Sequence, residues 1–343
     1  MCKIQEPNSW KNSSTHYIKV LSNEWYQILI KLQNLISIET MKFYEKKKII
    51  TMHLPVTAGT ISSPMGRGSD SSPVKIKLQG VETYLADSMQ FLLEYGCRLN
   101  KNGVYYVMPS FRGEKADERH LCQFYHSEAE ISGTLEDVMN LVDEYIKYLS
   151  KIILKKLGKE LKLAIGDISH IKKIAKYKGK FSRITFDEAE RKLKEIHSSD
   201  VKKYIEYNDG WRNITKKGEQ ELIKLYGGIV WITNYDELAV PFYQKVDENI
   251  KGTTRNADLL MGIGETVGCG ERHYDYNSLK SALKKHEIEP DEYEWYIKMK
   301  KIAPMQTAGF GMGVERFLMW VLKAEDIRNM QICLRFNGEN ILP

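Results

Sequence analysis

Ala308-Gly-Phe-Gly-Met-Gly-Val-Glu-Arg-Phe317 leads directly into the apolar run Leu318-Met-Trp-Val-Leu322. Glycines occupy alternate positions (309, 311 and 313), so one face of a strand formed here carries no side chains. A flat ligand can lie against such bare backbone, where any Cβ atom would collide with it. The apolar run predicts a helix, and Arg316 in its first turn can reach a polyphosphate at the edge of the flat site. Taken alone, the segment is equally compatible with a Gly-rich strand-to-helix turn and a solvated arginine.

A second segment, upstream, has the pattern of a long β-hairpin. Residues 105–114 and 119–130 are two alternating runs around a short charged loop. The period of two puts four side chains on one face of the returning strand: Phe124, His126, Glu128 and Glu130. This face combines an aromatic plate with two carboxylates, which suits an adenine ring followed by an ammonium group.

Cationic or protonatable side chains gather at the tip of this hairpin. Arg112 precedes the charged loop, and Arg119 and His120 follow it. Such a cluster is suited to phosphate, although a surface hairpin with mixed charges has the same composition.

Both segments resemble motifs of a known family. The sequences FRGE (111–114), RHLCQF (119–124) and EAE (128–130), with AGFGMGVERF (308–317), are similar to motifs 2 and 3 of class II aminoacyl-tRNA synthetases, in particular the aspartyl and asparaginyl subgroup. Residues 41–55, a helix running into a strand that ends at Pro55, resemble motif 1, the dimer-forming element. The resemblance extends over residues 24–343. It implies an α+β fold with an antiparallel six-stranded sheet flanked by helices, and a homodimer.

The resemblance also implies ATP and Mg²⁺ as cofactors and assigns their site. The implied ATP-binding residues are Arg112, Glu114, Arg119, His120, Phe124, Glu265, Gly311, Gly313 and Arg316, and the implied Mg²⁺ ligands are Asp258 and Glu265. Activation makes an amino-acid carboxylate attack the α-phosphorus of ATP, and these two anions repel each other until cations intervene. Arg112 and Arg316 are therefore the implied catalytic residues. Without the resemblance, Asp258 and Glu265 would be interpreted as ordinary acidic residues on the surface.

The implied amino-acid site consists of Ser88, Gln90, Glu128, Glu130 and Arg272. The first two are expected on one face of a strand, and Arg272 is expected to bind the substrate side chain. Aspartate-specific members carry a lysine where this chain has Leu93, whereas Glu94 and Glu128 follow the asparaginyl pattern. An arginine donor with a carboxylate acceptor suits an amide. Aspartate bound in the reverse direction satisfies the same groups, so the choice between Asp and Asn stays open.

Three positions near the implied substrate depart from the family pattern. Thr307 replaces a histidine, Glu271 replaces a glutamine, and His273 replaces a glutamate. We expect these changes to alter the acceptor side of the site while adenylation is retained.

Residues 1–23 predict a polar tail without strands, and residues 24–343 predict a catalytic domain without the family's anticodon-binding barrel. We therefore expect transfer to a small nucleophile, ammonia in an asparagine-synthetase-like reaction or an amine of specialised metabolism. Transfer to tRNA is the alternative, with only the lysine-rich stretch 151–180 available for phosphate contacts. A non-catalytic regulator that binds amino acid and ATP is a further alternative.

Composition fits a cytoplasmic enzyme. The chain has 343 residues, a net charge of +6 and 42% hydrophobic residues, enough for a sizeable core. No apolar run reaches about 18 residues and no signal peptide is evident, so we expect no membrane segment. The cysteines at positions 2, 97, 122, 269 and 333 are far apart, which favours reduced thiols over a structural zinc site.

Overall fold

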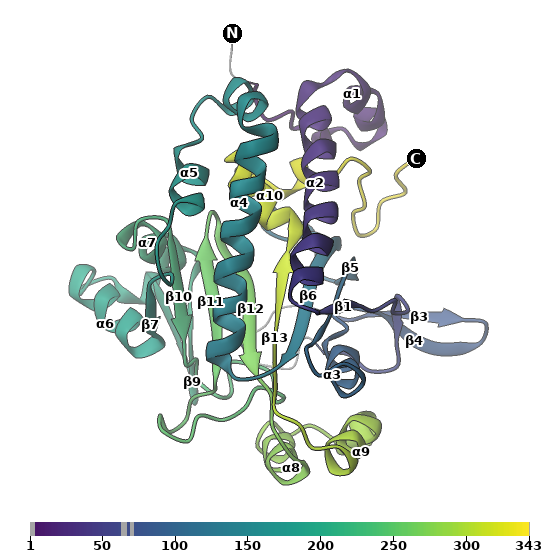
Figure 1. The fold of residues 1–343 in the computed structure, drawn as a ribbon, viewed down its shortest axis with the longest axis vertical. Coiled ribbons are helices and arrows are strands. Elements are labelled where there is room, and N and C mark those ends of the chain that lie inside the picture. Colours follow the sequence, from purple (N-terminus) through teal and green to yellow (C-terminus); the bar gives the residue numbers. More distant parts are fainter. Residues whose placement is uncertain (1–3, 63–66, 69–71, 343) are drawn as a thin grey trace.

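The alternate glycines lie on strand β13, near the middle of a large sheet (Figure 1). The structure is a computed structural model that describes residues 4–62, 67–68 and 72–342. Within these residues the sheet has eight strands in the order β1-β5-β6-β13-β12-β11-β10-β7. They are β1 (Ile50–Thr51), β5 (Val104–Phe111), β6 (Gln123–Ser132), β7 (Arg183–Thr185), β10 (Ile229–Thr233), β11 (Asn256–Met261), β12 (Gly264–Glu271) and β13 (Thr307–Gly313).

The sheet confirms the predicted α+β class and corrects the predicted number of strands. The six strands from β5 to β10 pair antiparallel, as expected. In the described part of the chain, β1 and β7 add one parallel strand at each edge. These edge strands have two and three residues, too few for a period of two to be recognised in the sequence.

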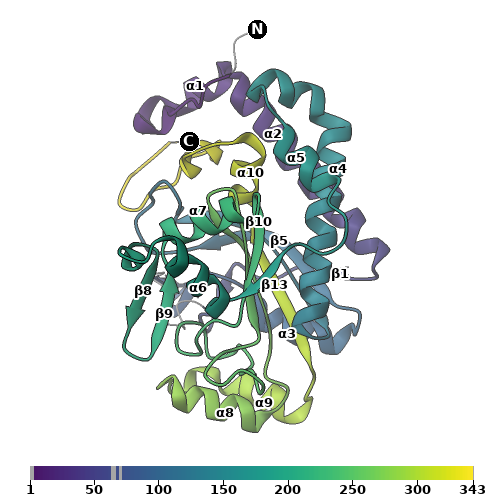
Figure 2. The ribbon, with the colours of Figure 1, turned by 90° about the vertical axis from the view of Figure 1, so that its left-hand side faces the viewer.

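Helices cover both faces of the sheet. They are α1 (His16–Ser22), α2 (Glu24–Lys46), α3 (Gln90–Leu99), α4 (Leu135–Ile165), α5 (Ser169–Ala175), α6 (Phe186–Ile196), α7 (Lys216–Leu225), α8 (Tyr276–Lys285), α9 (Glu294–Ile302) and α10 (Val314–Leu322). Figure 2 shows α4 and α5 on one side of the sheet and α6 with the hairpin of β8 (Ile205–Asn208) and β9 (Trp211–Ile214) on the other. No helix in the described residues is both long and apolar enough to cross a membrane.

The largest core lies between the sheet and the α2–α4 layer. Apolar side chains of α4 are buried against those of β11, β12 and β13, among them Tyr145 and Phe310. A capping box at Thr134 and Asp137 starts α4 immediately after β6. Farther along, Asp143 accepts hydrogen bonds from the Trp231 Nε1–H (2.8 Å) and the Phe181 backbone N–H (2.9 Å), which fixes α4 to β10.

Smaller elements extend from this body. Strands β2 (Thr57–Ala58), β3 (Val74–Leu78) and β4 (Val81–Leu85) form a separate sheet whose β3–β4 hairpin projects outward (Figure 1). Two 3-10 turns, Ser9–Lys11 and Ser13–Thr15, precede α1. His16 is buried there, with its Nδ1 2.9 Å from the Ser9 hydroxyl.

The pairing of β6 with β13 explains the alternate glycines. The predicted hairpin is present as β5 and β6, and β13 lies beside β6 with Gly309 opposite Glu130 and Gly311 opposite Glu128. A Cβ atom at Gly309 would lie 1.7 Å from the Glu130 Oε2, and one at Gly311 would lie 3.0 Å from the Glu128 Oε1. The absence of side chains at these two glycines therefore leaves space for the carboxylates of Glu128 and Glu130 on the neighbouring strand.

We predict that Gly309→Ala lowers the free energy of unfolding by about 1–3 kcal/mol, because the added methyl overlaps the Glu130 carboxylate. Gly313→Ala is the matched control on the same strand, since its Cβ would meet no atom closer than 3.7 Å. Urea unfolding of both variants measures the difference. Equal losses of stability would contradict this explanation of the glycines.

Candidate active site

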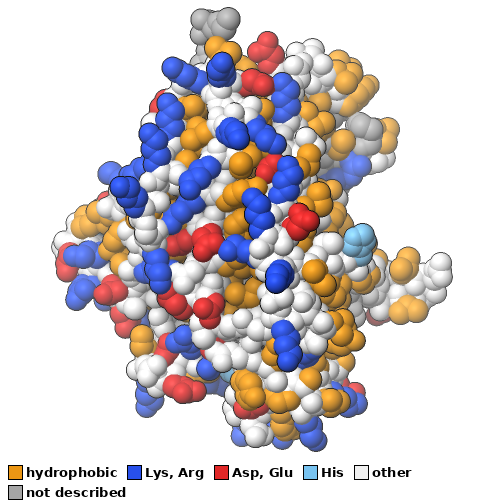
Figure 3. All heavy atoms as spheres, in the orientation of Figure 1, with side chains coloured by type: hydrophobic (Ala, Val, Ile, Leu, Met, Phe, Trp, Pro, Cys, Tyr) orange, Lys and Arg blue, Asp and Glu red, His pale blue; other side chains and the backbone are white. Residues whose placement is uncertain are grey.

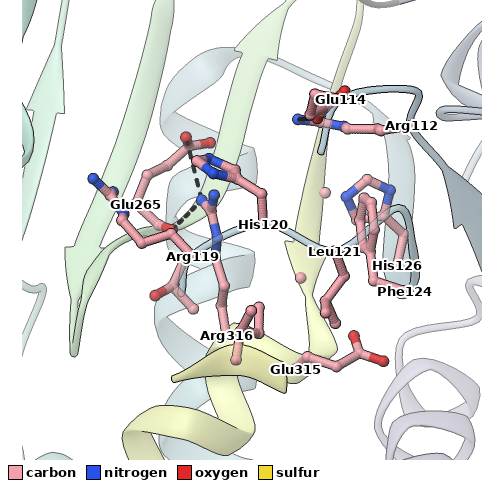
Figure 4. Close-up of a pocket in the computed structure, with 14 residues that line it drawn as sticks. Arg112, Glu114, Arg119, His120, Leu121, Phe124, His126, Glu265, Glu315 and Arg316 are labelled. Carbon is pink, nitrogen blue, oxygen red and sulfur yellow. Dashed lines mark hydrogen bonds and ion pairs between the residues drawn. The ribbon is translucent and has the colours of Figure 1, made fainter. Parts of the chain in front are cut away.

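Two cavities that share part of their walls open on the face of the sheet opposite α4. All nine residues predicted to bind ATP line the first cavity, and they come from β6, β12, β13, α10 and the loop between β5 and β6 (Figure 4). The second cavity is lined by all five residues predicted to bind the amino acid and by both predicted Mg²⁺ ligands. Arg112, Glu265 and Arg316 line both cavities. The fold thus brings every predicted site residue into one continuous space.

An aromatic ring and a guanidinium mark one end of the first cavity. The Arg112 guanidinium carbon lies 5.5 Å from the centroid of the Phe124 ring, and His126 meets that ring edge-on at 4.7 Å. The Arg112 Nη1 lies 3.9 Å from the Glu114 Oε1. A planar base can therefore lie on Phe124 within reach of a cation.

Cations of the opposite wall are held by carboxyl and carbonyl oxygens. Arg316 donates through Nη1 to the backbone carbonyl of Glu265 at 2.7 Å. Arg119 donates to the Glu219 Oε2 at 2.5 Å, and His120 Nδ1 lies 3.0 Å from Asp117 Oδ1. These contacts hold the guanidinium groups of Arg316 and Arg119 at the space beside the bare β13 backbone, where a polyphosphate would lie.

Glu219, on α7, is a site residue that the sequence did not indicate. It lines the second cavity, and burial raises the pKa of its carboxyl group, opposed by Arg119. Its partner Arg119 lies 100 positions away in the chain. No local pattern around Glu219 signals this contact.

Two carboxylates converge above Gly268. Asp258 is on β11 and Glu265 is on the adjacent β12. A Cβ atom at Gly268 would lie 3.0 Å from the Glu265 Oε1 and 3.5 Å from the Asp258 Oδ1. Burial raises the pKa of Asp258 well above its usual range, and the negative charges of Glu265 and Glu219 add to this effect.

This pair fits Mg²⁺, which prefers oxygen ligands and keeps water or phosphate oxygens in its shell. The described residues hold no group of three or more metal-ligating side chains. The protein would therefore supply two carboxylates, and the remaining ligands would come from the nucleotide and water.

The far end of the second cavity carries a buried arginine. Arg272 donates to the Glu130 carboxylate through Nε (3.1 Å) and Nη2 (3.0 Å), and to the Gln244 Oε1 through Nη1 (3.1 Å). These bonds use three of its five N–H groups, so two are left for a ligand. Burial raises the pKa of Glu130 to about 7, with Arg272 opposing the shift and Glu94 adding to it.

Glu128 is anchored by several donors. Its carboxylate accepts from the Tyr106 hydroxyl (2.5 Å) and the Ser88 hydroxyl (2.7 Å), and lies 3.0 Å from the His126 Nδ1. Burial by itself would raise the pKa of Glu128, but His126, Tyr106 and Ser88 together lower it. Glu128 is thus suited to remain ionised and to receive an ammonium group.

The predicted strand around Ser88 and Gln90 is wrong. Strand β4 ends at Leu85, Ser88 lies in the following loop, and Gln90 is the first residue of α3. The Gln90 backbone N–H donates to the Ser88 hydroxyl at 3.2 Å. Both residues still reach the cavity, because the loop turns them toward β6.

The three residues that depart from the family pattern do not line either cavity. Glu271 points to the other side of the strand from Arg272 and accepts from Arg255 Nε (2.7 Å) and Lys245 Nζ (3.0 Å). His273 is buried with its Nε2 3.1 Å from the Phe242 carbonyl oxygen. The expectation that they alter the acceptor side is therefore not supported. Glu271 and His273 belong to the packing around the site, and Thr307 is buried on β13 beside Glu130.

The lysine-rich stretch lies behind the sheet. Figure 3 shows blue side chains spread over the face on which α4 lies, and α4 carries Lys147, Lys151, Lys155, Lys156, Lys159 and Lys162. Some of these lysines form contacts within the protein, such as Lys156 with Glu39 at 2.9 Å. Basic residues of the cavity wall come from other segments, including Arg67 and Lys216.

A family profile described as tRNA synthetases class II (D, K and N) matches residues 11–333. The chain belongs to this family. It is 32% identical over 258 residues to an asparagine–tRNA ligase of Pyrococcus abyssi, an alignment that covers 74% of this chain and 57% of the relative. An asparagine–tRNA ligase of Malacoplasma penetrans is 31% identical over 316 residues, covering 89% of this chain and 69% of the relative.

The fold of this synthetase chain is also that of a solved relative. Asparaginyl-tRNA synthetase from Pyrococcus horikoshii, complexed with asparaginyl-adenylate, superposes with a TM-score of 0.82 at 25% identity. The match covers 94% of this chain and 71% of that chain.

These relatives correct the expected acceptor. An asparagine-synthetase-like reaction with ammonia or another small amine was favoured over tRNA, and that preference is wrong, since the relatives are named asparagine–tRNA ligases. That expectation depends on residues 151–180 as the only surface available for tRNA phosphates. Because α4 and α5 lie on the face of the sheet opposite the cavities, those lysines do not indicate which charges surround the cavity opening.

Proposed function

We propose that this synthetase chain activates asparagine with ATP and transfers it to tRNA. The observation that carries the proposal is the continuous cavity in which the predicted nucleotide, metal and amino-acid residues meet. The relatives named asparagine–tRNA ligases support the choice of amino acid and acceptor. We further propose that residues 24–343 form the catalytic domain.

The chemistry of the first step follows from the charges. The α-carboxylate of asparagine is ionised at neutral pH, so no general base is needed for its attack on the α-phosphorus. Arg112 and Arg316, which line both cavities, neutralise the phosphate charge that otherwise repels this attack. Mg²⁺ held by Asp258 and Glu265 would add positive charge beside the other phosphates. Catalysis is then mainly positioning and charge neutralisation.

The amino-acid end favours an amide side chain. Glu128, supported by Ser88, is placed to receive the ammonium group, with Gln90 beside it. An amide can accept from the free N–H groups of Arg272 and donate to Glu130, whereas an aspartate side chain would bring a second carboxylate against Glu130. A non-catalytic regulator would not need both phosphate-side arginines.

The direct test is amino-acid-dependent exchange of pyrophosphate into ATP, followed by transfer of labelled asparagine to bulk tRNA. We expect exchange with asparagine, weaker exchange with aspartate, and acid-precipitable label on tRNA. Absence of exchange with both amino acids in the presence of Mg²⁺ would contradict adenylation. Exchange without label on tRNA would contradict only the proposed acceptor.

The roles of three arginines can be separated by mutation. Arg112→Ala and Arg316→Ala should each lower kcat roughly a hundredfold to a thousandfold, since each removes a cation from a developing polyanion. Arg272→Ala should chiefly raise the KM for asparagine. Steady-state exchange kinetics measure both parameters. Similar losses of kcat in all three variants would refute the assignment of Arg272 to the substrate side chain.

We also propose a homodimer through α2 and β1. Ile30, Ile38 and Met41 are exposed on one side of α2, and Ile50 is exposed on β1, which is an edge strand. Burying such a row of apolar side chains against a second copy would remove them from water. Sedimentation should show a dimer at micromolar concentration and a shift toward monomer for Met41→Glu. A wild-type monomer under these conditions would rule the interface out.

A further inference from the structure

A fully buried ion pair lies directly behind the amino-acid end of the second cavity. Lys300 on α9 places its Nζ 2.5 Å from the Glu94 Oε2 on α3, and neither side chain is exposed. The other Glu94 oxygen accepts from the Tyr296 hydroxyl at 2.6 Å. None of the three residues lines either cavity.

This ion pair is joined to the pocket on two sides. Lys300 also donates to the backbone carbonyl of His273 at 2.7 Å, and His273 directly follows Arg272. Glu94 lies one helical turn after Gln90 on α3, on the same side of that helix. Movement of Lys300 would thus be passed to the peptide that carries Arg272 and to the helix that starts at Gln90.

The ion pair also interacts electrostatically with the residues of the amino-acid pocket. Glu94 acts electrostatically on both Glu130 and Arg272. Arg98, half-buried on α3, donates to the backbone carbonyls of Glu94 (2.6 Å) and Ala303 (2.9 Å) rather than to the Glu94 carboxylate. Lys300 is therefore the cation bonded to that carboxylate.

Two basic and two acidic side chains meet at this buried end. Arg272 and Lys300 are the basic pair, Glu94 and Glu130 are the acidic pair, and none of the four side chains is more than 4% exposed. An uncompensated charge in such surroundings is strongly unfavourable. Without Lys300, Glu94 would be a second buried carboxylate competing with Glu130 for Arg272. Without Glu94, Lys300 would have no carboxylate partner. Its protonated amine would then attract the side-chain carboxylate of a bound aspartate.

We propose that Lys300 is a positioning residue for the amino-acid pocket. By neutralising Glu94, it keeps Arg272 paired with Glu130 and so sets the preference of the pocket for a neutral amide over a carboxylate. The inference rests on the proposed activation of asparagine and adds a residue that acts through its neighbours.

The test compares Lys300→Met, Glu94→Gln and the double variant in pyrophosphate exchange with asparagine and with aspartate. Lys300→Met should raise the KM for asparagine at least tenfold with little change in kcat, because the phosphate-side arginines are untouched. Glu94→Gln should reduce the preference for asparagine over aspartate at least tenfold. The double variant restores charge balance and should bring both values within about threefold of wild type.

Two further variants distinguish the loss of the Lys300 charge from the loss of its packing. A double variant as impaired as Lys300→Met would overturn the proposal, and so would Lys300→Met with an unchanged KM. Lys300→Arg keeps the charge and should retain a KM near that of wild type. If Lys300→Met does not fold, as judged by thermal unfolding, Glu94→Gln and the double variant still decide the outcome. Wild-type protein without asparagine-dependent exchange would refute the proposed function and the inference with it, whereas active wild type with unaffected variants would refute the inference alone.

Discussion

The pairing of β6 with β13 is the constraint on which the rest of this structure depends. One strand carries carboxylates and the other carries glycines at the facing positions, so the carboxylates fill the space that side chains on β13 would occupy. The intervening residues of β13, Phe310 and Met312, point to the opposite side and belong to the core under α4. The alternation of a single strand thus separates the core from the site.

The same strand pair gives two carboxylates different properties. Glu128 and Glu130 are two positions apart on β6 and are both buried. Three donors hold Glu128 in its ionised form, and its pKa is lowered. Glu130 has Arg272 as its cationic partner and the negative charge of Glu94 nearby, and its pKa is raised to about 7. The two carboxyl groups therefore differ in how readily they ionise, although they face the same cavity.

Two sequence interpretations failed for the same physical reason. Glu271 was assigned to the acceptor side because it adjoins Arg272 in the chain, yet its carboxylate is bound by Arg255 and Lys245 away from the cavities. The lysines of α4 were considered as the surface for tRNA, yet they lie on the face opposite the site. In both cases the fold sets the face on which a side chain lies. Neighbouring residues of a strand such as β12 point to opposite sides, and the packing of α4 against the core puts its lysines on the other side of the sheet from the cavities.

The β5–β6 hairpin, the glycine strand with its helix and the residues that line the first cavity could all be predicted from the sequence, because each depends on a short period or a local motif. The sequence also determined the family, whose motifs are contiguous. The edge strands β1 and β7, the positions of Ser88 in the loop before α3 and of Gln90 at its first residue, and the contacts of Glu219 and Glu94 depend on the tertiary structure. Those contacts join residues 100 and 202 positions apart. No local period encodes such distances, since the partners meet only when the sheet and its covering helices have packed together.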